Sequence, residues 1–398
     1  MSAKKFFFMN ILLVLTVSII FLFTSIAFAG KVIKIGASMS LTGKYARTGV
    51  YTKNGYELWA EQINARGGLL GQKVKFVVYD DQSDPKKAAK LYEKLITSDK
   101  VNLLMGPYSS GVTFAASTVT EKYKFPMITA GATSEEIWKR GYKYVFGTGP
   151  HNELYYVGAF EIAKKWGFKT IGIINADDLF PSSLAKAVHK LAKKSGIKEI
   201  FSEEFPKGAK DFTTIITKLK AKNPDILFGG TYLPDSVLIV RQMREQKYSP
   251  KMIILSVGPS LPDFQKSLGA DANYVMCESF WEPAINTPGN KEFTEAYKKK
   301  FGAEPEYHSA WAYSGCQVLE KAVKEAGCLD KEKIRKALAK IEVTTLLPGV
   351  YKVDSTGMQI GQISMVAQWL DGKREVVWPD KHATKKAVLP VPSWDKRK

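Results

Sequence analysis

The chain has 398 residues, of which 45% are hydrophobic, and a formal net charge of +19. This length and composition exclude a disordered chain and favour two globular domains with sizeable cores. The positive charge does not indicate nucleic-acid binding, because most of it is lysine interleaved with glutamate on predicted helix faces, and no basic run alternates with stacking aromatics. We therefore expect a solvated basic surface and no nucleic-acid partner.

The N-terminus is predicted to be a cleaved signal peptide covering residues 1–29. Two lysines precede an apolar stretch over residues 6–23, and the small-x-small sequence Ala-Phe-Ala follows directly before Gly30. An uncleaved membrane anchor is the alternative, because the stretch is nearly long enough to cross a bilayer. Polar residues within the stretch favour cleavage. No cysteine follows it, so no lipid anchor is expected, and the mature protein is expected to be soluble in the periplasm.

From residue 32 onward, buried strands alternate with amphipathic helices. Apolar runs such as VIKIGASMS and VNLLMG predict strands, and the helical spacing of apolar residues between them predicts helices. The order predicts a parallel sheet covered by helices on both faces. Strands are expected at 32–40, 73–81, 101–106 and 126–132, and helices at 55–68, 85–99 and 112–123.

A second series with the same alternation begins near residue 151, so two α/β units of one architecture are expected side by side. No low-complexity linker separates them, which favours a hinge of several short crossovers. The strands are expected at 170–176, 199–205, 225–232 and 251–258, and the helices at 154–167, 183–196, 212–223 and 235–247. A further strand at 273–281, helices at 291–302 and 310–327, and a β-rich end at 349–354 and 362–372 complete the series.

Motifs for catalysis and phosphate binding are missing. The nearest candidate for a P-loop, Gly43-Lys44, is followed by Tyr45 and lacks the first glycine, and Gly147-Thr148-Gly149 continues to Asn152 instead of the third glycine of a dinucleotide fingerprint. No serine lies in a G-x-S-x-G nucleophile elbow. We expect no catalytic residues and no cofactor.

Metal-binding and disulfide frameworks are also not expected. The histidines show neither metal-site nor triad spacing, and the three cysteines are too far apart for a zinc cluster. At most one disulfide can form, and the spacing does not identify it. The residues concerned are His151, His189, His308 and His382, with Cys277, Cys316 and Cys328.

Two polar turns follow adjacent predicted strands. Ser109-Ser110-Gly111 comes after the third strand, where a helix start offers N–H groups and hydroxyls to an anion. After the fourth strand, Gly131 permits close backbone approach and Thr133 begins a capping-box spacing. Because the carboxyl ends of parallel strands meet at one edge of a sheet, both turns are expected to face one ligand.

Together these segments resemble the periplasmic solute-binding proteins of the Leu/Ile/Val-binding class, which supply ABC importers of branched-chain amino acids, amides and related molecules. The resemblance covers residues 32 to about 375. It implies a type I periplasmic binding protein: two Rossmann-like lobes of parallel sheet flanked by helices, joined by a three-crossover hinge, with the ligand in the cleft. It rests on IGASMSLTGKYARTG, GYELWAEQINARGGLLGQKV, YDDQSDPKKA, GPYSSGVTFAAS, PMITAGAT, KDFTTIITKLKAKNPDILFGG and LPGVYKVDSTG.

The resemblance also implies where the lobes divide and which residues bind. Lobe 1 is expected to comprise residues 30–150 and 282–360, and lobe 2 residues 151–281 and 361–398. From lobe 1, Ser110, Gly131 and Thr133 fall where the family holds the α-carboxylate and α-ammonium of its ligand. From lobe 2, Tyr232 and Phe180 are expected as aromatic walls, although Thr231 competes with Tyr232. The remaining ligand-binding residues are expected to be Ser109, Val257 and Tyr45.

The sequence departs from the family in two places. Amino-acid binders often carry a glutamate for the ligand ammonium where this chain has Val257, and Ser83 and Ser109 stand where relatives have a disulfide. A buried ammonium without a carboxylate partner is costly, so either the ligand has no ammonium or another acid supplies the charge. The candidate acids are Asp177, Asp178, Asp235, Glu153 and Glu282.

The expected function is therefore capture of a small carboxylate- or amide-bearing solute, and its delivery by domain closure to the permease and ATPase subunits of an ABC importer. The protein is expected to act as a monomer. A ligand-sensing receptor subunit of the same fold is one alternative. A secreted serine hydrolase or amidase, acting through Ser109 or Ser110, is the other.

Overall fold

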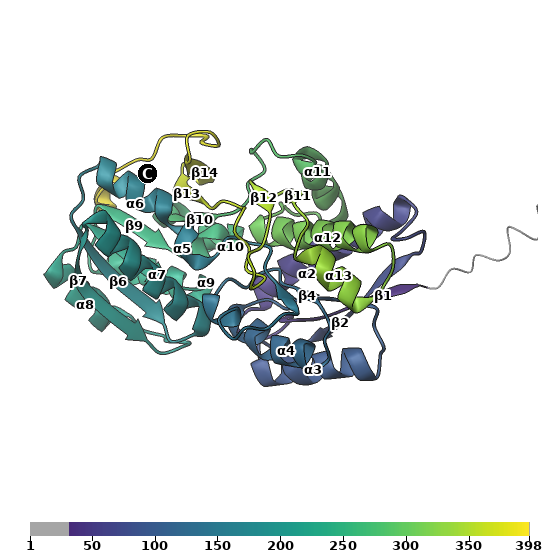
Figure 1. Cartoon of the computed structure of the whole chain (residues 1–398). Helices are drawn as coiled ribbons and strands as arrows, with labels where there is room; N and C mark the ends of the chain where they lie inside the picture. Colours follow the sequence, from purple (N-terminus) through teal and green to yellow (C-terminus); the bar gives the residue numbers. More distant parts are fainter. Residues whose placement is uncertain (1–31, 398) are drawn as a thin grey trace, which may run out of the picture.

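Two β-sheets, one in each lobe, organise the structure, a computed structural model that describes residues 32–397 (Figure 1). The predicted signal peptide lies outside the described residues. Within residues 32–397, none of the helices combines the length and apolarity that a bilayer span needs.

Lobe 1 is built on a five-stranded parallel sheet in the order β2-β1-β3-β4-β5. Its central strands are almost wholly buried, as their unbroken apolar sequences predict. The strands are β1 (Ile33–Met39), β2 (Val74–Asp80), β3 (Leu103–Met105), β4 (Met127–Ile128) and β5 (Val145–Phe146). The helices between them are α2 (Ala46–Ala65), α3 (Pro85–Thr97) and α4 (Ser110–Lys122).

Later segments of the chain return to lobe 1. Helix α12 (Tyr307–Ala326) packs along α2, and α11 (Asn290–Phe301) also contacts α2. Helix α13 (Lys331–Leu338) packs on α12, and a two-stranded ladder of β11 (Val343–Thr344) and β12 (Val350–Tyr351) follows.

Helix α2 begins nine residues earlier than the sequence indicates. Its first turns contain threonine, valine and Gly49, which are weak helix formers, so propensity alone does not extend the helix there. Packing decides instead, because a side chain at Gly49 would run into the carbonyl oxygen of Ser40. The start of α2 is thereby held against the end of β1, which places the preceding residues at the edge between the lobes.

Lobe 2 carries a seven-stranded sheet in the order β14-β13-β10-β9-β8-β6-β7. The first five strands of the chain order run parallel, whereas β13 and β14 form an antiparallel hairpin at one edge. The strands are β6 (Thr170–Ala176), β7 (Lys198–Phe205), β8 (Ile226–Gly230), β9 (Met252–Leu255), β10 (Met276–Ser279), β13 (Met365–Leu370) and β14 (Lys373–Trp378). The helices are α5 (Asn152–Tyr155), α6 (Val157–Lys165), α7 (Leu179–Ser195), α8 (Thr213–Lys222), α9 (Leu233–Glu245) and α10 (Pro262–Leu268).

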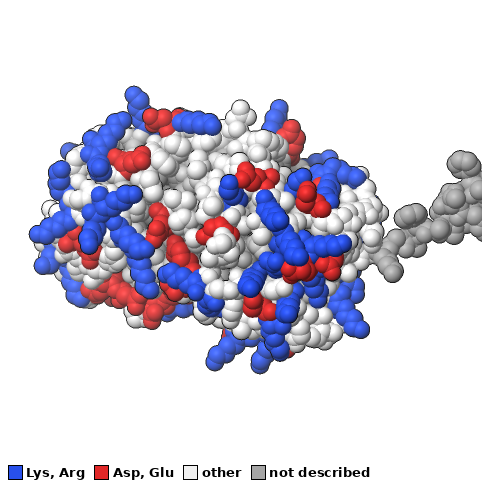
Figure 2. All heavy atoms as spheres, viewed as in Figure 1, with Lys and Arg blue, Asp and Glu red and all other residues white. Residues whose placement is uncertain are grey.

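The chain passes between the two sheets three times: after β5, after β10 and after β12. This confirms the predicted class, two α/β lobes joined by three crossovers, and Figure 1 shows the lobes side by side. The division at residues 150, 281 and 360 stays a prediction. On the face that Figure 2 shows, lysine and arginine side chains are spread over both lobes with acidic side chains between them.

Candidate functional site

Loops at the carboxyl ends of strands from both lobes enclose one small cavity. The loops after β3, β4 and β5 approach from lobe 1, the loops after β6, β8 and β9 approach from lobe 2, and the start of α12 closes the remaining side. Ligands of α/β proteins bind at such an edge, because loop N–H groups and helix N-termini converge there. The cavity volume is about 10 Å³, which is room for about one water molecule.

The structure brings seven of the eight predicted site residues to this cavity. Tyr45 is the exception: it does not line the cavity, but its ring centroid lies 5.0 Å from that of Tyr232. Contact of these residues with a solute stays a prediction. The seven are Ser109, Ser110, Gly131, Thr133, Phe180, Tyr232 and Val257.

Five further lining residues were not identified from the sequence. All are aromatic or imidazole rings near the points where the chain changes lobe, a position that resembles ordinary core packing when only the sequence is read. Tyr108 alone carried a signal, because it immediately precedes the predicted serine turn. The five are Tyr108, Tyr155, Tyr307, His308 and Trp311.

The serine turn is held tightly between the two strand ends. Ser109 adopts φ +80°, a conformation that costs energy for any residue with a side chain. Its Oγ accepts the N–H of Val112, 3.3 Å away, and so caps α4. Ser110 Oγ accepts the N–H groups of Thr133 and Ser134, both at 3.2 Å, so it joins the two turns and keeps its own O–H proton for another acceptor.

The hydroxyl of Thr133 is differently placed from the expectation. It donates to Asn152 Oδ1 at 2.7 Å and lies 2.8 Å from the Tyr155 hydroxyl, so both its hydrogen-bonding functions are already used inside the protein. Thr133 therefore ties lobe 1 to the first crossover. The donor that faces a solute from these turns is Ser110, together with the first N–H groups of α4.

Gly131 is required by two independent constraints. Its φ of +126° lies in the region that favours glycine, and a Cβ there would lie 2.7 Å from Cδ2 of Tyr108. The Tyr108 ring therefore packs directly on the backbone of the second turn, with its other side toward the His308 ring at a centroid distance of 5.2 Å.

Charged groups meet across the lobe boundary just outside the cavity. The Tyr45 hydroxyl donates to Asp178 at the start of α7, and Asp178 also pairs with Lys44 at 3.6 Å and Lys207 at 3.2 Å. Burial lowers the pKa of Lys44, although nearby carboxylates oppose the shift. Burial and the Asp178 carboxylate raise the pKa of Tyr45. Asp178 is thus occupied by protein cations, and its neighbour Asp177 is exposed.

The other acids considered as ammonium partners are also engaged. Glu153 pairs with Lys190 on the surface, and the buried Glu282 pairs with Arg374 through an Nε–Oε1 distance of 2.6 Å. Asp235 accepts the N–H at the start of α9 and caps that helix. None of the five acids lines the cavity.

Glu278, which the sequence reasoning did not consider, is a buried acid at the carboxyl end of β10. It accepts the Val257 N–H at 2.9 Å, the Tyr307 hydroxyl at 3.3 Å and the Tyr156 hydroxyl. Burial raises its pKa. The signal in the sequence was an acid inside the apolar run YVMCESFW.

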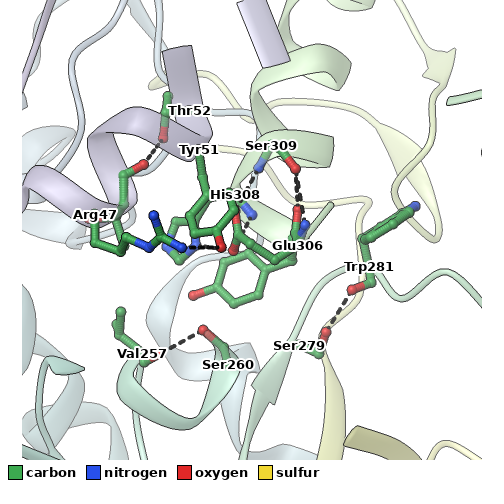
Figure 3. A network of polar contacts seen from close by, with 12 residues as sticks. Arg47, Tyr51, Thr52, Val257, Ser260, Ser279, Trp281, Glu306, His308 and Ser309 are labelled. Atoms are coloured by element: carbon green, nitrogen blue, oxygen red, sulfur yellow. Dashed lines mark hydrogen bonds and ion pairs between the residues drawn. The ribbon is translucent and has the colours of Figure 1, made fainter. Parts of the chain in front are cut away.

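A buried carboxylate–imidazole pair lies at the start of α12 (Figure 3). Glu306 Oε2 is 2.6 Å from His308 Nδ1, and Glu306 also accepts the N–H groups of His308 and Ser309, each at 3.0 Å. The Figure 3 view places this pair opposite Val257, whose carbonyl oxygen accepts the hydroxyl of Ser260.

The cysteines form no disulfide. Cys277 and Cys316 are buried, Cys328 is partly exposed, and all three are free thiols.

Comparison with known proteins places this geometry among binding proteins. A family model described as "Periplasmic binding protein" matches residues 32–374. "Leu/Ile/Val-binding protein homolog 7" of Brucella suis is 30% identical over 394 residues, which cover 94% of this chain and 98% of the relative. LivJ of Streptococcus pneumoniae, a branched-chain amino acid transporter substrate binding protein solved with isoleucine, shares 26% identity and a TM-score of 0.78, with 88% of this chain and 100% of that chain covered. The leucine binding protein LivK of Thermotoga maritima has the same fold, with 24% identity, a TM-score of 0.79, and coverage of 86% and 97%.

Proposed function

The chain belongs to the periplasmic binding protein family, and on this premise we propose that it captures a small carboxylate- or amide-bearing solute, similar to a branched-chain amino acid, outside the cytoplasm. It then delivers the solute to the permease and ATPase subunits of an ABC importer. The observation that carries the proposal is a single cavity enclosed by strand-end loops of both lobes. The isoleucine complex of LivJ supports a solute of this size.

In this proposal lobe 1 holds the polar end of the solute. The Ser110 hydroxyl keeps a free proton, and the N-terminus of the 13-residue helix α4 adds N–H groups and the positive end of its dipole. The rings of Tyr232 and Phe180 cover the rest of the solute from lobe 2. A solute that bridges both lobes stabilises the closed state in proportion to its greater affinity for that state.

The geometry gives less support to a hydrolase. The Oγ atoms of Ser109 and Ser110 accept backbone N–H groups, and across residues 32–397 neither is hydrogen-bonded to an imidazole that could act as a base. The cavity-lining histidine, His308, is bonded to Glu306 instead. A sensor subunit shares every feature of the binding cleft, and the partner protein distinguishes it.

Native mass spectrometry of the purified protein, followed by identification of the small molecules released on denaturation, tests the proposal. We expect a stoichiometric small acid or amide, whose binding calorimetry confirms after it is re-added to stripped protein. The same solute should be recovered unchanged after prolonged incubation. Its conversion to a product would favour the hydrolase, and genes for a signalling partner in place of permease and ATPase neighbours would favour the sensor.

A further inference from the structure

Three ionisable side chains are buried together beside the cavity. Glu278 and Glu306 have no exposed surface, and His308 is 2% exposed. The imidazole of His308 is committed to Glu306 through the Nδ1 contact, and two backbone N–H groups complete the coordination of that carboxylate. Glu306 and His308 therefore form a satisfied pair.

Glu278 is left with neutral partners only. Its acceptors are filled by one backbone N–H, from Val257, and by the hydroxyls of Tyr156 and Tyr307. Among the described residues no lysine, arginine or histidine forms an ion pair with it, whereas the buried Glu282 nearby has Arg374. The buried cluster thus contains two carboxyl groups and one imidazole, and it lacks one positive charge. A buried acid without a cation is costly and marks a functional position more often than a structural one.

Glu278 lies one side chain behind the cavity wall. Val257 and Tyr307, which it holds by hydrogen bonds, both line the cavity. Tyr307 belongs to lobe 1 and Glu278 to lobe 2, so the bond between them spans the cleft. Lobe opening removes the Tyr307 hydroxyl and leaves the carboxyl group facing the entering solute. Val257 adopts φ +43°, and its N–H bond to Glu278 helps to hold this unfavourable conformation.

We propose that Glu278 binds a cationic group of the solute, so that the solute is a zwitterion whose ammonium meets Glu278 while its carboxylate meets the Ser110 turn. This inference rests on the proposed function and narrows its solute class to amino acids and close analogues. It also assigns the acid whose absence at Val257 left two alternatives open: the charge comes from the neighbouring strand, β10. The other five acids are exposed or already bonded within the protein.

Calorimetric titration of stripped protein tests the inference with paired probes. One probe of each pair is an L-amino acid, for example leucine, isoleucine or valine, and the other is the carboxylic acid of the same skeleton without the amino group, such as 4-methylpentanoate for leucine. We expect the wild type to bind at least one amino acid ten or more times more tightly than its partner acid. This comparison requires no variant.

The variant Glu278→Gln keeps the shape and an acceptor for the Val257 N–H but removes the negative charge. We expect it to weaken amino-acid binding at least tenfold and to leave binding of the partner acid within about twofold of wild type. Glu203→Gln, on the outer strand β7 of the same lobe, is the matched control and should change neither. Thermal unfolding without solute monitors the fold of both variants.

The two levels of proposal fail differently. Binding of amino-free acids with equal or greater affinity than their amino-acid partners overturns the role of Glu278 and leaves the proposed function standing. Unchanged amino-acid affinity in folded Glu278→Gln overturns it as well. Failure of both probe classes, together with the absence of any co-purified small acid or amide, contradicts the proposed function itself.

Discussion

Ser110 determines the geometry of the polar end of the cleft, because one oxygen atom joins two turns. It accepts two buried N–H groups, and at the same time its proton is the hydroxyl donor left for a solute. The sequence identified this residue and Gly131 because hydroxyl and glycine residues directly after buried strands have few other uses. It did not reveal that Asn152 and Tyr155 occupy the Thr133 hydroxyl, since hydrogen-bond partners about 20 residues apart leave no local pattern.

Replacement of the two hydroxyls should separate their roles. Ser110→Ala removes a solute donor and unpairs two buried N–H groups, so we expect roughly ten- to hundredfold weaker binding and a lower free energy of unfolding. Thr133→Val breaks only internal bonds, and its effect on affinity should be smaller than that of Ser110→Ala. Ser182→Ala, whose hydroxyl bonds the exposed Glu204, is the control. Calorimetry with the identified solute decides, and near wild-type affinity in folded Ser110→Ala would place the carboxylate grip elsewhere.

A steric test at the same scale uses two glycines with positive φ. Gly131→Ala adds a methyl group 2.7 Å from the Tyr108 ring, whereas a Cβ at Gly67 (φ +97°) meets nothing within 4 Å. Gly67→Ala should therefore cost only the backbone strain, about 1–2 kcal/mol, and leave affinity unchanged. Gly131→Ala should lower the melting temperature further and weaken binding, because Tyr108 must move into the cavity. Equal unfolding curves for both variants would contradict the packing of Tyr108 on this turn.

At the scale of elements, the start of α2 and the start of α7 form the contact that connects the lobes at the cleft edge. The early start of α2, which propensity does not predict, brings Tyr45 to Asp178 and Arg47 to within 2.8 Å of Asp263 in α10. Glu135 of lobe 1 bonds the hydroxyl of Ser183 in α7 at 2.9 Å. These groups are polar and close only in the closed arrangement, so they bias closure more than they stabilise either lobe.

Tyr45→Phe isolates this contact, because it removes the hydroxyl that Asp178 accepts and keeps the ring against Tyr232. Loss of a hydrogen bond to a charged acceptor, about 1.5–3 kcal/mol at most, should destabilise the closed state and weaken solute affinity several-fold, mainly through faster dissociation. Tyr144→Phe removes a hydroxyl that bonds Glu332 within lobe 1 and serves as the control. Stopped-flow dissociation rates measure the effect, and identical rates for both variants and wild type would show that Tyr45 does not contribute to closure.

At the scale of the whole molecule, a cavity of about 10 Å³ means that the structure is closed more tightly than any amino acid permits. A solute can enter only when the lobes move apart about the three crossovers. The alternation of strands and helices predicts both α/β units. It does not predict the antiparallel hairpin of β13 and β14, because the two strands are joined by a short turn within one continuous apolar segment. It also does not predict the cavity, which exists only when six strand ends from two units meet.

Trp311 gives this movement a spectroscopic signal. It lines the cavity from α12, its Nε1 donates to Thr148 Oγ1 at 3.0 Å in the first crossover, and its ring lies 5.4 Å from that of Phe280 in the second. Solute binding and closure change the surroundings of this indole, whereas Trp166 is 44% exposed on the far side of lobe 2. We expect the solute-induced change in tryptophan fluorescence to be largely lost in Trp311→Phe and kept in Trp166→Phe. The phenylalanine preserves most of the apolar wall, so calorimetry should still show solute binding to Trp311→Phe. A full fluorescence change in that variant would mean that binding proceeds without rearrangement at the crossovers, and that the closed arrangement is not the end point of solute capture.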